Sequence, residues 1–409
     1  MNTSSASKKT VLMISATPLF LDRGTPIRIV EQAAALQARG HRVEIVCPPG
    51  GSPKLPRGMS LSIHRLPAMF GSEEFVRPGP SIRKAFYDVV LVPYTWKLLR
   101  TIRPDILHGH NHEGLLIGAI ARWLLRITNR KSIPRLVGDL HGSFSTEMRA
   151  YGWARGFVQR FFSVIETWID RCADLLVTSS EENTEQLRVR SPHQPITFVP
   201  DGVAIDAFKN LPSKHDLRKQ FGIDTTVVVI GYTGAFTEDK GFPLLLSALE
   251  NVLSEDSSAH VIIGGFPDDH VREWVQHQKF KDRFRIISPL YYDDVPRLLA
   301  TCDIAADPKN SLTQQSSGKI LNYMAAGLPI VCFDRPTNRA YVGDGAQYAV
   351  SESADALAEA IKILCQNVSL RTQMGEENRL RALNWTWAHT AATLEQVYPP
   401  SSRRTSGLR

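Results

Sequence analysis

Residues 316–333 read SSGKILNYMAAGLPIVCF, a helix pattern followed directly by a strand pattern. Small polar residues open a helix in which apolar residues recur at helical spacing from Ile320 onward. Gly327 can end that helix, Pro329 cannot continue it, and Ile330–Phe333 then predicts a buried strand. A helix that starts with serine and glycine offers unpaired backbone N–H groups and the positive end of the helix dipole. The stretch therefore predicts a phosphate-binding helix that precedes a buried strand.

Short apolar runs alternate with amphipathic helical segments in both halves of the chain. Such alternation predicts an α/β protein with parallel sheets covered on both faces. The expected strands are Val11–Ser15, Val43–Cys47, Ile106–His108, Leu136–Asp139, Leu175–Thr178, Thr197–Val199, Val227–Tyr232, His260–Ile263, Arg285–Ile287, Ile304–Ala306 and Ile330–Phe333. The expected helices include a segment around residues 29–36 and the segments Leu244–Leu253, Val295–Ala300, Lys319–Ala326 and Ala354–Gln366.

The chain has 409 residues, enough for two ordinary domains, and a net charge of +7. The basic excess gathers between Arg77 and Arg160, which fits either an anionic partner or a solvated basic face. The five cysteines form no CxxC pair, so we expect neither a disulfide framework nor a zinc site. This cysteine usage favours a protein of the reducing cytosol. The apolar segment Val11–Leu21 is better explained as a first strand than as a signal peptide, and no transmembrane helix is expected.

Several short motifs occur along the chain in a fixed order. They are Gly40–Val43, Asp105–His110, Asp139–Gly142, Val199–Val203, Tyr232–Gly234, Lys240-Gly241, the helix of residues 316–327, and Trp385 with Trp387. Together they make the chain resemble the retaining glycosyltransferases of family 4, also called group 1, which have the GT-B fold. The resemblance implies two Rossmann-like doubly wound domains facing a central cleft. It covers nearly the whole chain.

The resemblance also implies a domain division. We expect an acceptor domain over residues 1–205, rejoined by a C-terminal helix over residues 385–400, and a donor domain over residues 225–384. The polar, proline-containing segment 206–224 is the expected linker, and residues 401–409 are expected to be a disordered tail.

The donor site is expected in the second domain. Lys240 is expected to stabilise the leaving diphosphate, and Ser316, Ser317 and Gly318 to bind phosphate through backbone N–H groups. Alternatively, Ser316 and Ser317 only cap the helix, and Lys240 is an ordinary solvated lysine of a loop. The remaining expected donor contacts are Gly24, Thr25, Gly234, Gly265, Leu290, Gln314 and Asn322.

The chain departs from the family pattern at three of its positions. Many members carry two glutamates where this chain has Gln314 and Asn322, and an arginine where it has Ala235. The two amides can still bond hydroxyl groups but carry no charge. These departures keep open a non-catalytic protein that binds sugar nucleotides or glycans.

His141 follows a predicted strand and, by resemblance, contacts the donor sugar near the reacting carbon. Glu147 is a weaker candidate for orienting the site or binding acceptor. His108, His110, Asn111 and His112 look like a metal cluster, but one strand end should not aim so many adjacent side chains at one ion, so supporting and loop roles are expected. No metal or other cofactor is expected, and the donor is a nucleotide-diphosphate sugar.

Aromatic and basic residues mix in Arg149–Trp168, where Phe157, Phe161 and Trp168 share one helical face. This pattern fits an interfacial membrane helix or a helix packed on the sheet. Tyr87–Leu99 has a similar character.

The prediction is a glycosyltransferase that transfers a sugar, with retention, to a glycan or lipid-linked acceptor for a cell-surface polysaccharide or glycolipid. We expect it in the cytoplasm, with peripheral contact to an anionic membrane. An epimerase of the same fold is an alternative, but no convincing carboxylate pair supports it. The chain has no GxGxxG after a strand and no nucleic-acid-binding module, which argues against a dehydrogenase and a nucleic-acid partner.

Overall fold

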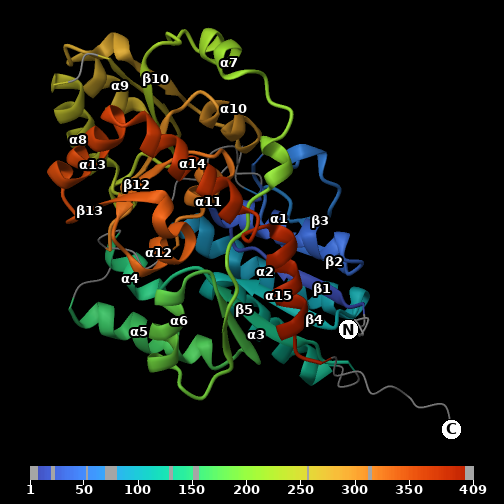
Figure 1. The fold of residues 1–409 in the computed structure, drawn as a ribbon. Coiled ribbons are helices and arrows are strands. Elements are labelled where there is room, and N and C mark those ends of the chain that lie inside the picture. The colour runs from blue at the N-terminus through green and yellow to red at the C-terminus, as the bar shows by residue number, and fades with distance from the viewer. Residues whose placement is uncertain are drawn as a thin grey trace. The chain divides into compact units, whose positions relative to one another are not determined.

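The computed structural model describes residues 8–19, 24–51, 54–69, 81–128, 132–150, 156–255, 258–311 and 316–400. The chain divides into two compact units, each an α/β domain (Figure 1). The first comprises residues up to Asp201 and those from Trp387 onward, and the second comprises Gly202–Thr386.

The first unit is built on a seven-stranded parallel sheet of order β3-β2-β1-β4-β5-β6-β7. Successive side chains of its central strand face opposite sides, so Val11 and Met13 enter one apolar core and Leu12 and Ile14 the other. The strands are β1 Thr10–Ile14, β2 Arg42–Cys47, β3 Ser62–Arg65, β4 Ile106–His110, β5 Arg135–Leu140, β6 Leu175–Thr178 and β7 Ile196–Phe198.

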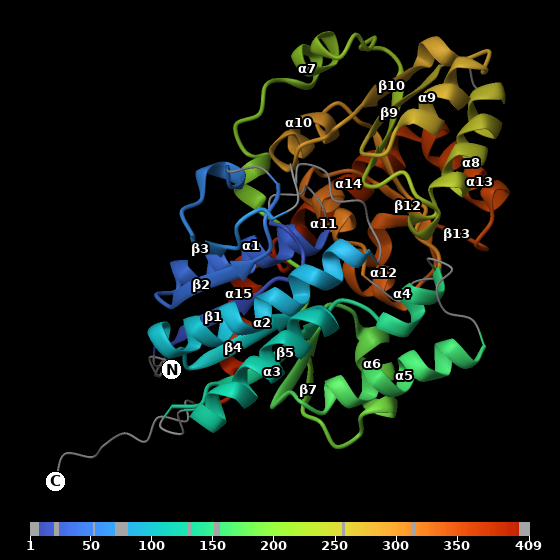
Figure 2. The same ribbon diagram turned by 180° about the vertical axis from the view of Figure 1, so that it is seen from behind.

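Helices cover both faces of this sheet. Two of them, α1 and α15, pack against each other on one face, although they come from opposite ends of the chain (Figure 1). On the other face α2 and α3 lie side by side (Figure 2). The helices are α1 Gly24–Ala38, α2 Ile82–Ile102, α3 Asn111–Thr128, α4 Phe144–Ala150, α5 Phe157–Asp170, α6 Glu181–Arg190 and α15 Trp387–Val397, with a one-turn helix at Pro56–Gly58.

The second unit is built on a six-stranded parallel sheet of order β10-β9-β8-β11-β12-β13. Its strands are β8 Val228–Thr233, β9 Ala259–Gly264, β10 Phe284–Ile287, β11 Ile304–Asp307, β12 Ile330–Phe333 and β13 Ala346–Ala349. One face packs against α8 and α13, and the other against α10 and α11.

The helices of this unit are α7 Lys214–Gln220, α8 Phe242–Glu255, α9 Asp269–Gln276, α10 Val295–Leu299, α11 Gly318–Ala325, α12 Pro336–Val342, α13 Ala354–Gln366 and α14 Val368–Ala382. One-turn helices lie at Ile205–Phe208, Glu238–Lys240, Lys281–Arg283, Tyr292–Asp294 and Gly343–Gly345.

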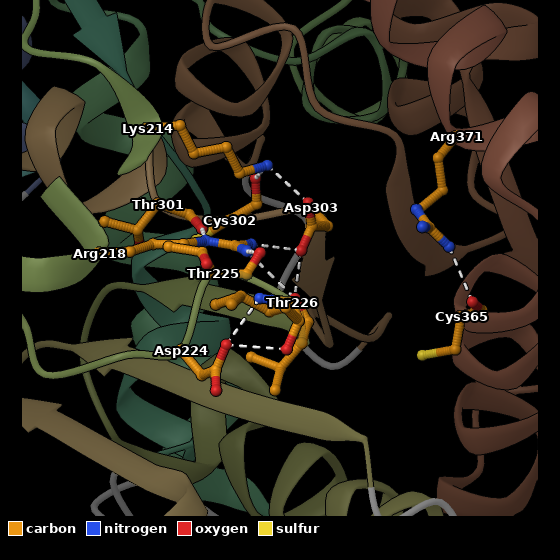
Figure 3. A network of polar contacts seen from close by, with 12 residues as sticks. Lys214, Arg218, Asp224, Thr225, Thr226, Thr301, Cys302, Asp303, Cys365 and Arg371 are labelled. Carbon is orange, nitrogen blue, oxygen red and sulfur yellow. Dashed lines mark hydrogen bonds and ion pairs between the residues drawn. The ribbon is translucent and has the colours of Figure 1, made fainter. Parts of the chain in front are cut away.

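The segment 206–224, which we expected to be a linker, carries α7 and is fastened to the second unit. Lys214 and Arg218 each place a side-chain nitrogen 2.5 Å from a carboxylate oxygen of Asp303 (Figure 3). The same carboxylate accepts a hydrogen bond from the backbone N–H of Val229 at 2.7 Å. This network fixes α7 to the start of β8, and the chain divides after Asp201 rather than after residue 205.

The prediction of an α/β fold with doubly wound parallel sheets is confirmed. The sequence analysis did not predict the edge strands β3 and β13, nor the helices α3, α4, α6, α7, α9, α12 and α14. Within the described ranges, no helix combines the length and apolarity that a transmembrane span requires.

Candidate functional site

The predicted phosphate-binding helix is α11 of the second unit. Ser317 is its N-cap residue and Gly318 its first residue. The Ser317 hydroxyl is buried, caps no backbone N–H and has no hydrogen-bond partner within the described residues. The helix start therefore offers a hydroxyl that no described residue uses.

The loop of Lys240 and Gly241 is held against the strand-end segment that precedes α11. Gly241 has a φ of 71°, and a Cβ there would overlap the carbonyl oxygen of Pro308. Only glycine suits both the conformation and the close approach. Lys240 places its ammonium 2.7 Å from Asp239. Burial raises the pKa of Asp239, but Lys240 outweighs that and lowers it overall.

The ends of β8, β9 and β10 meet close to one another in this unit. Gly234 donates its backbone N–H to Gly264 at 2.9 Å, and a Cβ on Gly265 would overlap the Gly234 carbonyl oxygen. The side chain of Leu290 packs onto Gly264 so closely that a Cβ there would overlap it. The structure thus brings the predicted residues Gly234, Gly265 and Leu290 together at the carboxyl ends of parallel strands, where such sheets bind ligands.

Three charged residues that sequence reasoning missed lie at the same place. Asp307 ends β11 and is fully buried, with Lys319 Nζ 3.2 Å from its Oδ1. Lys309 is also buried and donates from Nζ to the carbonyl oxygen of Ser316 at 2.8 Å. Their closeness in sequence to the serine-rich helix start was the available signal.

The positions that depart from the family pattern differ in what the structure shows. Asn322 lies one helical turn from Gly318 and is half-buried. Ala235 accepts a hydrogen bond from the Tyr232 hydroxyl through its carbonyl oxygen at 2.7 Å. Gln314 lies outside the described residues.

In the first unit, His141 directly follows β5 and faces the start of α1. Its Nδ1 lies 3.1 Å from the Thr25 hydroxyl, and its Nε2 lies 3.5 Å from Asp139 Oδ1. Burial lowers the pKa of His141 to about 4, with Arg28 adding to the effect and Asp139 opposing it. The imidazole is therefore neutral near pH 7 and can accept or donate one hydrogen bond. Gly24 begins α1, where an added Cβ would meet nothing within 4 Å.

The carboxylate beneath His141 is held by α1. Arg28 donates to Asp139 from Nε at 3.1 Å and from an Nη at 3.2 Å, and Gln32 donates to it at 3.0 Å. The other Nη of Arg28 lies 2.5 Å from Asp201. Burial raises the pKa of Asp139, but Arg28 and the nearby histidines lower it well below its usual range overall. Sequence reasoning missed Arg28 and Gln32, although their i, i+4 spacing puts both on one face of α1.

Two further histidines share the face of Asp139. The rings of His108 and His110 stack with centroids 4.6 Å apart, and His108 Nδ1 lies 2.8 Å from the Tyr398 hydroxyl. Donor atoms of His108, His110 and Asp139 lie within 4.8 Å of one another, a spacing that a metal ion could bridge. Of the expected cluster, only His108 and His110 come together here, because side chains two residues apart share a face. Arg28 already donates to both oxygens of the Asp139 carboxylate, so a metal ion there would compete with the guanidinium.

His112 lies apart from this group. Its Nε2 is 3.4 Å from Glu166 and 3.3 Å from Asp170. Burial lowers the pKa of His112, but the two carboxylates outweigh that and raise it. Glu166 also accepts the backbone N–H groups of Phe144 and Ser145 at 3.0 and 3.3 Å, which fixes the start of α4 after His141. The Glu147 side chain lies outside the described residues.

Comparisons with known proteins agree with this arrangement in both units. Residues 23–202 match the glycosyl transferase 4-like domain, and residues 213–381 match the glycosyl transferases group 1 domain. D-inositol 3-phosphate glycosyltransferase of Corynebacterium diphtheriae is 25% identical over 314 residues, or 73% of this chain and 71% of the relative. Phosphatidyl-myo-inositol mannosyltransferase of Mycobacterium leprae is 21% identical over 383 residues, or 92% of each chain.

A solved structure of Anabaena Alr3699/HepE in complex with UDP and glucose superposes with a TM-score of 0.71 at 16% identity. The superposition covers 94% of this chain and 98% of the other. The shared fold is the GT-B arrangement of two Rossmann-like domains, as the sequence predicted. The chain belongs to the group 1 glycosyltransferases with a glycosyl transferase 4-like first domain.

Proposed function

We propose that this glycosyltransferase transfers a sugar from a nucleotide-diphosphate donor, with retention of configuration, to a glycan or lipid-linked acceptor. The observation that carries the proposal is the convergence at one end of the second sheet. The Lys240-Gly241 loop, the open start of α11 and two further lysines meet there. Fixed N–H groups and cations stabilise the charge that develops on a leaving diphosphate.

The chemistry assigned to this site needs no protein nucleophile. The bond from the sugar C1 to the diphosphate oxygen breaks as the bond from C1 to the acceptor oxygen forms on the same face. The acceptor proton passes to the leaving phosphate oxygen. The neutral imidazole of His141, held by Thr25 and Asp139, then binds and orients the donor sugar. We propose that no metal takes part and that the lysines supply the positive charge.

The relatives narrow the choice of donor and acceptor to test. One structure of the same fold was solved with UDP and glucose, so UDP sugars are the first donors to try. One relative is named a phosphatidyl-myo-inositol mannosyltransferase, which supports an acceptor carried by a lipid. Polysaccharide or glycolipid synthesis at the inner face of the cytoplasmic membrane is the corresponding proposal.

The surface of α5 supports contact with a membrane. Phe157 is 82% exposed, Val164 69%, and Phe161 and Trp168 more than half, so this apolar face points to solvent. The expectation that the helix packs on the sheet holds only for its other face, where Ile169 is buried. Large exposed aromatic side chains beside arginines suit an anionic lipid surface.

Donor hydrolysis, with water as acceptor, tests the proposed reaction. The protein is incubated with UDP-, GDP- and ADP-sugars, and proton NMR follows the first-formed anomer of the released sugar. We expect one donor to react and to release the anomer of the donor, unchanged by a metal chelator. Lys240→Ala should lower the rate by about 100-fold or more, because it removes charge stabilisation from the transition state. Lys281→Ala, a change at an exposed lysine, should leave it unchanged.

The same experiment separates a second candidate, a non-catalytic protein that binds sugar nucleotides. The neutral residues Ala235 and Asn322, where many family members carry charge, favour this candidate. It predicts binding of a nucleotide sugar with no turnover. Release of the inverted anomer would contradict the retaining reaction, and conversion of the donor to another nucleotide sugar would indicate an epimerase.

A further inference from the structure

Position 235 is alanine where many family members carry an arginine that shares the phosphate with the lysine of the Lys-Gly pair. The structure places another cation beside that position. An ideal Cβ on Gly234 would lie 3.4 Å from the Nζ of Lys319. The ammonium of Lys319 therefore lies at the end of β8, next to the backbone from which the missing arginine would extend.

Lys319 is held firmly in this place. It is the second residue of α11, and its side chain is 14% exposed. Its Nζ lies 3.2 Å from Asp307 Oδ1, 3.3 Å from the Tyr232 hydroxyl and 4.4 Å from the centroid of the Tyr232 ring. The ion pair and the aromatic face together fix the ammonium at the helix start.

Other positive groups lie near the Lys319 ammonium. Burial lowers the pKa of Lys309 well below its usual range, and repulsion from Lys240, Lys319 and Arg335 adds to it, with Asp307 opposing. Lys240 and Lys319 thus add positive charge beside Lys309, and Asp239 and Asp307 lie against them. Such a cluster favours the binding of a polyanion.

A buried polar group also points to a ligand here. The hydroxyl of Ser317, which is 4% exposed, has no hydrogen-bond partner within the described residues, and it stands directly before the first residue of α11. A buried hydroxyl without a partner costs free energy unless a ligand or water satisfies it. A phosphate oxygen at the helix start would accept from this hydroxyl and from the N–H groups of the first turn.

We propose that Lys319 supplies the diphosphate-binding charge that the alanine at position 235 does not. This inference rests on the proposed function and adds that the phosphate-binding charge enters from α11 instead of from the loop after β8. It explains how a chain without that arginine still balances the charge of a nucleoside diphosphate.

The test compares the affinities of two probes by calorimetry and saturation-transfer NMR. The probes are the nucleoside diphosphate that the wild type binds and the matching nucleoside, which lacks phosphate. Lys319→Met should weaken the diphosphate by about 10-fold or more and the nucleoside by less than about twofold, because only charge-assisted hydrogen bonds are lost. Lys319→Arg should keep most of the diphosphate affinity, since it keeps the charge.

A second variant guards against misfolding. Lys319→Met leaves the buried Asp307 without its ion-pair partner, so the double variant Lys319→Met/Asp307→Asn removes both charges together. It should keep the wild-type melting temperature within a few degrees and show the same selective loss of diphosphate affinity. Lys362→Met, at a surface lysine that pairs with Glu255 and Glu359, is the matched control.

The outcomes separate this inference from the proposed function. If the wild type binds no nucleoside diphosphate, the proposed function fails and this inference fails with it. If the wild type binds one and the double variant binds it equally well, only the inference is overturned. A parallel loss of nucleoside affinity would also overturn it, since that indicates a structural role for Lys319.

Discussion

The guanidinium of Arg28 donates hydrogen bonds to both carboxylate oxygens of Asp139, and the two side chains are 3% and 0% exposed. The carboxylate in turn lies 3.5 Å from the imidazole of His141. This ion pair therefore couples the first turns of α1 to the end of β5 and sets the surroundings of His141.

Removing one partner of this pair should destabilise the first unit strongly. Arg28→Met leaves Asp139 as an uncompensated buried charge, which costs about 3–5 kcal/mol in such pairs. Arg28→Met/Asp139→Asn removes the charge as well and should recover part of that loss. Urea unfolding followed by circular dichroism measures both. If Arg28→Met has the same free energy of unfolding as Arg28→Met/Asp139→Asn, the unpaired carboxylate costs no stability and the ion pair is unimportant.

His141 should make the stability of the fold depend on pH below neutrality. Its pKa is lowered to about 4 in the folded chain, from an ordinary value of 6.5. Between these values the unfolded chain binds more protons, so stability is complete above pH 6.5 and falls as the pH drops towards 4. The expected loss is roughly 2 kcal/mol by pH 5, from about 1.4 kcal/mol per pH unit for one proton.

His141→Gln removes this titration and is the comparison variant. The difference in unfolding free energy between wild type and variant should shrink as the pH falls from 7.5 to 5. Urea unfolding across that range measures it. A difference that stays constant with pH would show that His141 has an ordinary pKa in the folded chain.

Gly241 should tolerate no side chain, whereas Gly58 should tolerate one at modest cost. Both have positive φ, 71° and 65°, but a Cβ on Gly241 would overlap the backbone of Pro308 and one on Gly58 would meet nothing within 4 Å. Gly58→Ala should cost about 1–2 kcal/mol from backbone strain alone. Gly241→Ala should cost clearly more and should also displace Lys240 and lower donor turnover. Equal costs in urea unfolding would show that the loop can move away from Pro308.

The exposed face of α5 should direct binding to anionic vesicles. Phe161→Glu/Val164→Glu places two negative charges on that face and should lower co-flotation with phosphatidylglycerol vesicles by about 10-fold or more, because it removes buried apolar area and adds repulsion. Val368→Glu at the start of α14 changes a comparably exposed apolar residue of the second unit and should have little effect. Failure of the wild type to float with anionic vesicles would refute the membrane proposal.

The sequence predicted the parts of the fold that have strong local signals. The central strands are apolar and buried, and α8, α11 and α13 have apolar stripes, so their existence and their order could be inferred. The edge strand β3, Ser-Ile-His-Arg, has little apolar character to detect. Helix α14 has no apolar stripe and packs on α11, as its buried residues Met374, Gly375 and Asn378 show.

The candidate site divides in the same way. Lys240, Gly241 and the start of α11 lie in short motifs, and the structure brings them together. The contacts of Arg28 with Asp139 and Asp201 join residues more than a hundred positions apart, which only the folded sheet brings together. Lys319 lies within the stretch of residues 316–333. Its partners Asp307 and Tyr232 come from the strands β11 and β8, which only the fold brings to it.

The proposed donor site depends on the binding of a nucleoside diphosphate, which melting temperatures can detect. Melting temperatures of the wild type and of Lys240→Ala are compared with UDP, GDP, ADP and their sugar conjugates at millimolar concentration. We expect one nucleotide to raise the wild-type melting temperature by several degrees, since binding to the folded state alone adds about 2.7 kcal/mol at 100 times the Kd. Lys240→Ala should lose most of that shift. No shift of the wild-type melting temperature with any of these ligands would show that the protein has no such donor site.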